Sequence, residues 1–383
     1  MDHWQQSRID KKMTNNNLII NGNFNLWQRG ITFSIPYNAA YSNLGAGGTT
    51  YTAPSKKVAD RWYVIDTQKR TAGSTGSISI YQELFGTSDE QSSRSENYIT
   101  IQNNITATTG GYCYLENKQE NSTQYGGVPL TISFYAKYSS GVTGATLGCY
   151  FREAVNPNTT EYKSIFSIVD TNSYWTHYST TFVPPYISNF GVSGDHYFGI
   201  GFRIMPNTTI SLSSVKLELG FAETPLYTDA TEEKKLQEKY YYTSYTHQTT
   251  PGTITLSKDT GNNDINAINF TVTPSYSYTH KFDIPQYKTP TITLYSPKSG
   301  TANDGYNKSA LTDMRLTSGT RGWNNTTRFS PTGAATLTTS GNTYGVIFSV
   351  ASGAVIFDDI LVHMVADADI DPSPYDRGLE TTT

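Results

Sequence analysis

The chain has 383 residues, a formal net charge of −4 at pH 7, and charged residues at only 16% of its length. This length predicts two domains with short tails, and the slight acidity excludes a broad basic field for nucleic acid or anionic lipid. No run of about 18 apolar residues predicts a membrane span. The 29 Tyr, with abundant Thr, Ser, Asn and Gly, favour strands and turns over helices.

Residues 1–17 form a polar and charged segment that contains three consecutive Asn. The segment lacks the apolar stretch of a secretory signal, and it cannot build a core alone. We expect an N-terminal arm that is either flexible or ordered on a partner.

Residues 18–228 show strand patterns with no helix between them. Apolar and polar residues alternate in Thr131–Tyr138, Tyr197–Ile204 and Ser214–Leu219. A period of two with one polar face is typical of antiparallel sheets that are wet on one side. The pattern predicts a jelly-roll-like β-sandwich over residues 18–228.

Residues 229–247 contain the one convincing helix of the sequence. Asp229 can cap it, and Glu232 can complete a capping box three residues later. Leu236 and Tyr240 share a face of this helix, which we expect to end among the tyrosines that follow. It is predicted to link two β-regions.

Residues 248–366 predict a second β-sandwich, and residues 367–383 an exposed tail. The span Ser296–Thr327 is rich in Gly, Asn, Ser and Thr and is expected to be a long loop. The expected strands are Thr253–Leu256, Asn269–Val272, His280–Ile284, Thr291–Tyr295, Tyr344–Val350 and Val355–Val365. The predicted fold class is therefore all-β, with two β-sandwich domains joined by a short α-helix.

An opening motif near the N-terminus concentrates large aromatic residues. Its members are Asn21, Gly22, Asn23, Phe24, Trp27, Arg29, Asp60, Arg61 and Trp62. The first three predict a tight turn after an apolar strand, Leu18–Ile20, and the aromatic residues then bring apolar area into a core. The two arginines would stack on an indole face or pair with Asp60. We expect this motif to serve packing before ligand binding.

Three segments resemble modules of bacteriophage tail-fibre and appendage proteins. Residues 17–30 and 59–62 resemble the NGNF-x-x-WQRG opening of that family and the ADRW that follows it. Val215–Gly220, running on into the predicted helix, is similar to the family's closing strand. Thr289–Pro297 with Ala366–Ala368 is similar to its last module. The resemblance implies a virion surface protein with a carbohydrate-binding-module-like sandwich. Such sandwiches often hold calcium, for which no ligands can be assigned.

The expected function is that of a bacteriophage structural protein of the fibre or appendage type on the virion surface. Its expected partners are other virion proteins of the capsid, tail or baseplate, further copies of itself in a trimer, and host-surface polysaccharide. One alternative is a capsid decoration or head-fibre protein anchored by residues 1–17. A less favoured alternative is a polysaccharide depolymerase.

Sugar binding needs exposed aromatic side chains beside short polar ones. The candidate glycan-binding or interface aromatics are Tyr174, Trp175, Tyr178, Tyr186 and Trp323. Core packing or a subunit interface explains each of them equally well.

The sequence shows no catalytic constellation, so a non-enzymatic protein is expected. Asp358 and Asp359 are adjacent on a predicted strand and point to opposite faces, which does not suit glycoside hydrolysis. Glu116 and Glu120 are expected in a polar loop. Asp195-His196 lacks an accompanying nucleophile elbow.

Metal and thiol chemistry are similarly unsupported. The six His show no metal-ligand spacing, and the segment 259–264 is better explained as a polar hairpin turn than as a calcium loop. No cofactor is expected. Cys113 and Cys149 are expected to be buried thiols, with a single disulfide left open.

Overall fold

A computed structural model divides the chain into two compact units, each described here by itself. Among the described residues, unit 1 spans 17–27 and 31–233, and unit 2 spans 28–30 and 234–369. The structure describes residues 17–36, 55–66, 68–70, 75–87, 89, 95–106, 108–110, 112–120, 125–140, 146–156, 159–169, 173–185, 197–221, 230–256, 264–272, 277–308, 311–315, 317–318, 324–329, 335–351 and 358–369.

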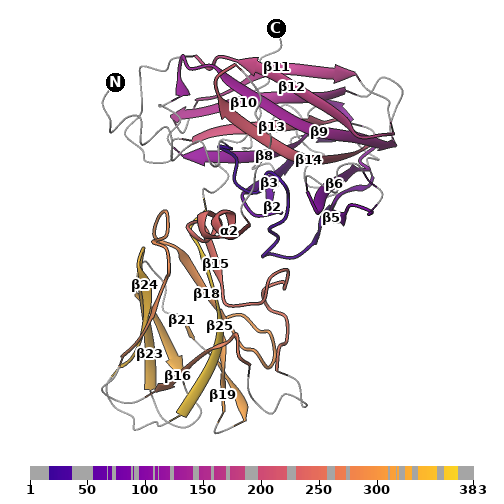
Figure 1. Ribbon diagram of the computed structural model, residues 1–383. Coiled ribbons are helices and arrows are strands. Elements are labelled where there is room, and N and C mark those ends of the chain that lie inside the picture. The colour runs from indigo at the N-terminus through magenta and orange to yellow at the C-terminus, as the bar shows by residue number, and fades with distance from the viewer. Residues whose placement is uncertain are drawn as a thin grey trace, which may run out of the picture. The chain divides into compact units, whose positions relative to one another are not determined.

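Unit 1 contains two six-stranded antiparallel sheets (Figure 1). Sheet 1 has the strand order β1 (Thr32–Pro36), β5 (Ser77–Leu84), β6 (Asn97–Asn103), β14 (Thr208–Leu219), β9 (Leu130–Ser140) and β12 (Thr176–Phe182). Sheet 2 has the order β11 (Thr159–Val169), β10 (Thr146–Asn156), β13 (Tyr197–Ile204), β8 (Cys113–Glu120), β3 (Trp62–Asp66) and β2 (Ser55–Lys57). A short ribbon pairs β4 (Lys69–Arg70) with β7 (Thr108–Gly110). The all-β fold class is confirmed.

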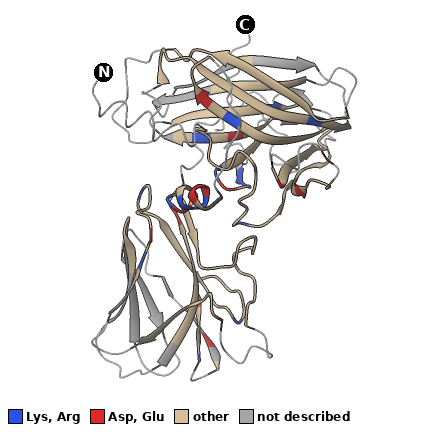
Figure 2. Cartoon of the chain, in the orientation of Figure 1, with Lys and Arg blue, Asp and Glu red and all other residues tan. Residues whose placement is uncertain are grey.

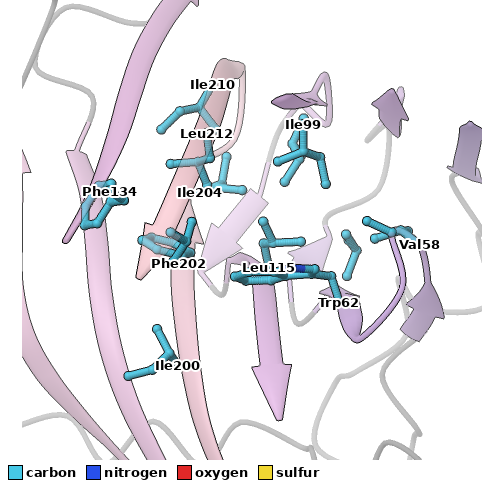
Figure 3. Close-up of a cluster of buried hydrophobic side chains, with 14 of the residues drawn as sticks. Val58, Trp62, Ile99, Leu115, Phe134, Ile200, Phe202, Ile204, Ile210 and Leu212 are labelled. Carbon is cyan, nitrogen blue, oxygen red and sulfur yellow. The ribbon is translucent and has the colours of Figure 1, made fainter. Parts of the chain in front are cut away.

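The core of unit 1 lies between the inner faces of these sheets. Alternation along β9 turns Ile132 and Phe134 inward, and alternation along β13 does the same for Phe202, all three fully buried. Phe134 and Phe202 meet across the two sheets edge to face, with ring centroids 4.9 Å apart. Figure 3 shows such residues converging from both sheets. The two cysteines are free and buried in this core, and burial raises the pKa of both thiols well above the ordinary value.

Asn21 organises the opening motif from inside unit 1. Its backbone has φ 60°, and its side-chain amide donates to the carbonyl oxygens of Leu26 at 2.8 Å and Asp60 at 3.0 Å. Its own carbonyl oxygen accepts the indole N–H of Trp62 at 2.9 Å. Phe24, Trp27 and Trp62 are fully buried. These residues therefore pack inside unit 1, and the side chains of Asn21 and Asn23 in the turn are buried.

The predicted strand Leu18–Ile20 is wrong. These residues bend. The segment that they begin approaches β14 through two backbone hydrogen bonds. The Leu18 N–H donates to the Leu217 oxygen at 2.8 Å, and the Val215 N–H donates to the Gly22 oxygen at 2.9 Å. A Cβ on Gly22 would lie 2.0 Å from the Val215 oxygen, so only glycine permits this approach.

Unit 2 is built around the long strand β25 (Asp358–Asp367). The first sheet pairs β25 with β15 (Tyr241–Thr243), β16 (Ile268–Val272), β18 (Thr291–Tyr295) and β19 (Asp304–Asn307), and β19 with β20 (Thr312–Arg315). The second has the order β17 (Ser277–Lys281), β24 (Gly345–Ala351), β23 (Ala335–Asn342), β22 (Asn324–Phe329) and β21 (Thr317–Ser318). Their shared core includes Phe270, Val346 and Val362.

The single helix of the described chain, α2, spans Ala230–Glu238 and is shorter than predicted. Tyr241 and Tyr242, which follow it, belong to β15, because aromatic residues suit a strand and these pair with β25. Its role as a linker remains a prediction.

Three other expectations for unit 2 fail. The expected loop Ser296–Thr327 contains β19 to β21 and the start of β22, since its Thr and Tyr residues pair despite the Gly and Asn around them. Thr253–Leu256 forms no strand. The expected tail begins too early, because Asp367 ends β25 while Ala368 and Asp369 are buried.

Candidate functional site

The predicted aromatic candidates separate into different environments. Tyr186 and Trp323 lie outside the described residues. Tyr178 packs against the core, with its ring centroid 5.6 Å from that of Phe134. Tyr174 is 63% exposed, and Trp175 is half-buried just before β12. Only the last two therefore face the surface of unit 1.

Trp175 is part of an aromatic platform, which we define as Phe85, Tyr98 and Trp175. Their ring centroids lie 4.7 Å (Phe85 to Tyr98), 5.1 Å (Phe85 to Trp175) and 5.1 Å (Tyr98 to Trp175) apart. Phe85 follows β5 and Tyr98 lies on β6, so the platform joins residues far apart in the sequence. All three rings are half-buried, which leaves them accessible on the outer face of sheet 1.

Small residues on β14 let these rings meet. In sheet 1, β14 and β9 lie between β6 and β12, so Tyr98 and Trp175 must reach toward each other across both strands. The outward residues of β14 there are Ser211 and Ser213, which are 1% and 0% exposed. Serine leaves room above the strand that a larger side chain would fill.

Charged groups border the platform on two sides. The Lys137 ammonium lies 5.0 Å from the Trp175 ring centroid and 5.4 Å from that of Tyr98, in cation–π geometry. Burial, followed by the charges of Glu83 and Asp89, raises the pKa of Tyr98. A ring surface with hydrogen-bonding groups at its edges can hold a sugar ring and its hydroxyls.

The outer face of sheet 2 carries a buried charged pair. Glu116, expected in a loop, lies on β8 with Lys118, and they are 1% and 0% exposed. Their side chains are 4.0 Å apart, and the Lys118 ammonium lies 4.3 Å from the Tyr197 ring centroid. The prediction of a loop was wrong because the charges of Glu116 and Lys118 make this part of the sequence look solvent-exposed, whereas the strand buries both of them. Figure 2 shows how few charges the described strands carry.

In unit 2, a buried histidine holds three segments against β25. His363 Nε2 lies 2.9 Å from Asp264 Oδ2 and 2.8 Å from Thr255 Oγ1, and Nδ1 lies 3.1 Å from Ser244 Oγ. The Tyr245 ring stacks on the imidazole at 3.9 Å. Burial lowers the pKa of His363 despite the nearby carboxylate. No local sequence pattern marks this cluster, since its members are distant along the chain.

This Ser-His-Asp arrangement resembles a hydrolase relay in connectivity alone. The Ser244 hydroxyl accepts the Met364 N–H at 2.9 Å, and the Ser244 N–H donates to the Met364 oxygen at 3.0 Å. The backbone donors beside the hydroxyl are therefore engaged and cannot stabilise an oxyanion. The cluster acts as a cross-link of the fold.

Arg29, in the first segment that carries the phage resemblance, contacts residues of the other two. Its guanidinium lies 3.7 Å from the Tyr241 ring centroid and 3.3 Å from Asp369 Oδ2, and it is 3.6 Å from Asp367 Oδ2. These contacts lie within unit 2, and the ring they place under the guanidinium is the phenol of Tyr241. Arg61 is buried in unit 1 and donates to the Lys118 carbonyl oxygen.

Among the described residues, no group of three His, Cys, Asp or Glu side chains could hold a metal ion. Calcium therefore stays an unassigned prediction, and Asp195-His196 lies outside the described residues. Within the described part of the chain, no helix has the length and apolarity to cross a bilayer.

No family model and no curated protein matches the chain. Solved structures that match include the enzymatically active domain of bacteriophage CBA120 tailspike protein 4, at 14% identity and TM-score 0.31, covering 54% of this chain and 22% of that one. Another is the C-terminal family 22 carbohydrate-binding module of Clostridium thermocellum Xyn10B, at 11% identity and TM-score 0.30, covering 43% of this chain and 89% of that one. A family 4 carbohydrate-binding module matches at 15% identity and TM-score 0.28, over 53% and 99% of the two chains. At such TM-scores these likenesses carry no argument about function.

Proposed function

We propose that this chain is a non-enzymatic bacteriophage protein of the fibre or appendage type that binds host-surface glycan through the aromatic platform. The platform is the observation that carries the binding part of the proposal. Three accessible rings with centroids about 5 Å apart offer the apolar surface on which the C–H face of a sugar stacks.

The phage part rests on the three resembling segments and gains physical support from Arg29. A side chain that contacts Tyr241, Asp367 and Asp369 ties the opening segment to the other two. The three segments then have a structural reason to occur together in one chain, since each supplies one member of the same cluster. A virion surface position and a trimeric state belong to the same proposal.

Replacing Trp175 tests the binding function. Trp175→Ala removes one ring of the platform, and we expect at least a tenfold loss of affinity for host-surface polysaccharide in a direct binding assay. Tyr174→Ala is the matched control, because Tyr174 is adjacent, 63% exposed and outside the platform. Equal affinities of Trp175→Ala and the unchanged protein would disprove the platform's role.

The remaining parts have separate tests. Incubation with the same polysaccharide should release no reducing ends, and steady release would overturn the non-enzymatic assignment. Light scattering should report a trimer, whereas a monomer would count against it. Mapping what residues 1–17 contact in an intact particle separates a tail fibre from a head fibre or capsid decoration.

A further inference from the structure

Lys137 borders the aromatic platform without a carboxylate partner. Its ammonium lies 5.0 Å from the Trp175 ring centroid and 5.4 Å from that of Tyr98. Among the described residues, no carboxylate forms an ion pair with this ammonium. The side chain is half-buried on the outer face of sheet 1, so solvent still reaches it. The two ring faces attract the cation and fix its position, but they do not neutralise its charge.

The strand order separates this cation from the acidic residues next to the platform. Glu83 lies on β5 and Asp89 follows that strand, and both are exposed. In sheet 1, β6 and β14 lie between β5 and β9, the strand of Lys137. Since neighbouring strands are about 4.8 Å apart, the backbones of Glu83 and Lys137 are separated by about 14 Å. The platform therefore has a cationic side at β9 and an acidic side at β5.

This polarity distinguishes between a neutral and an acidic ligand. A sugar that stacks on the rings carries its hydroxyls and any carboxylate around its edge. A neutral sugar would take water away from the Lys137 ammonium without supplying a counter-charge, which costs solvation free energy. A carboxylate at the same position would accept a charge-assisted hydrogen bond from the ammonium. The sugar hydroxyls at the opposite edge could then donate to Glu83.

We propose that Lys137 makes the platform select carboxylate-bearing sugars. The sugar ring stacks on the exposed parts of Trp175 and Tyr98, and its carboxylate pairs with the Lys137 ammonium. This inference rests on the proposed function, because it uses the same platform, and it deepens that function by naming the substrate class. The rings supply apolar surface for any sugar, whereas Lys137 supplies the preference for an acidic one.

Binding of oligogalacturonate, compared with binding of its methyl ester, tests the preference. The two probes share a backbone, and the ester lacks the charge, so the full chain should bind the acid at least tenfold more tightly. Lys137→Met keeps an apolar side chain against the rings and removes the ammonium. It should lose about tenfold in affinity for the acid, the scale of one charge-assisted hydrogen bond, and bind the ester unchanged. Lys137→Arg keeps the charge and should retain most of the affinity.

Lys56→Met is the matched control, because it removes the same charge elsewhere. Lys56 is exposed on β2 of sheet 2, with its ammonium 5.6 Å from the Phe33 ring centroid. This variant should bind the acid as the unchanged protein does. A urea unfolding midpoint of Lys137→Met close to that of the unchanged protein excludes misfolding as the cause of its loss.

The outcomes separate the substrate class from the platform itself. Equal binding of the acid and the ester, binding of neither, or unchanged binding of the acid by Lys137→Met would overturn the preference. If Trp175→Ala still loses affinity for host polysaccharide in that case, the platform stands and only the acidic substrate class falls. If Trp175→Ala binds host polysaccharide and oligogalacturonate as the unchanged protein does, the proposed function fails, and this inference fails with it.

Discussion

Two lysines of the unit 1 sandwich, one on the outer face of each sheet, lie in opposite environments. The outer face of sheet 1 also holds a buried pair, Lys216 and Glu218, whose charged atoms lie 3.0 Å apart. On sheet 1, Lys137 is half-exposed and lies over the rings of Tyr98 and Trp175. On sheet 2, Lys118 is fully buried with Glu116. Removing a cation that water still reaches costs little stability. Removing one member of a buried ion pair costs much more, because the other charge stays buried without a counter-ion. The position of Lys137 is therefore free to change for recognition, and that of Lys118 is constrained by stability.

The largest effect should come from breaking the buried pair. Lys118→Met leaves the Glu116 carboxylate buried without its cation, and we expect a loss of about 3–5 kcal/mol in the free energy of unfolding. Lys137→Met, the matched change on sheet 1, should cost less than about 1 kcal/mol, the scale of an accessible cation–π contact. Urea unfolding of both variants measures the difference. Similar costs would show that the two lysine positions do not differ.

A further buried charge, Glu233, sharpens the comparison because its environment lacks such a pair. Its Oε1 accepts the Asn21 N–H at 2.7 Å, while Oε2 is buried without a hydrogen-bond partner. Burial raises the pKa of Glu233 to about 7, although the Asn21 bond opposes this. Between the ordinary value of 4.5 and about 7, the unfolded chain binds fewer protons than the folded one. Stability conferred by this group is therefore lost as pH rises through that window.

Glu233→Gln keeps an acceptor for Asn21 and removes the titration. The variant should match the unchanged protein near pH 4 and exceed its stability by about 3 kcal/mol at pH 8. Glu232→Gln is the control, because Glu232 is exposed in the same helical turn, and it should leave the pH dependence unchanged. Parallel stability curves for Glu233→Gln and the unchanged protein would refute the raised pKa.

The sequence predicted the inner faces of these sheets better than the outer ones. Alternation identified the strands around Phe134 and Phe202 because burial of every second residue leaves a period of two. The same rule failed at Glu116 and Lys118, since polarity in the sequence does not reveal a charge that is paired and covered. Trp175 was named as a candidate from its residue type. Phe85 and Tyr98 were missed, because their meeting with it depends on the strand order and on the serines of β14.

Unit 2 shows a related limit. Strands β16, β18 and β25 were recognisable from runs of β-branched and aromatic residues. By contrast, the sequence predicts a loop over β19 to β21 and the start of β22, because Gly, Asn and Ser are poor strand formers. The stability of these strands comes from pairing with their neighbours. The His363 cluster was also invisible, since pairing of strands, and not local sequence, brings Asp264 and Ser244 to it.

The smallest expected effect compares two buried glycines on the outer face of sheet 2, Gly148 on β10 and Gly201 on β13. Gly148→Ala places a methyl group 2.5 Å from the Tyr150 ring, which must shift, so we expect a loss of about 1–3 kcal/mol. Gly201→Ala meets nothing closer than 3.7 Å and removes unfolded-state entropy, so it should be neutral or stabilising by about 0.5 kcal/mol. Thermal unfolding of the pair compares two glycines on the same face. If both alanines destabilise alike, a methyl group has no more room at Gly201 than at Gly148, and the tight packing of this face extends from β10 to β13.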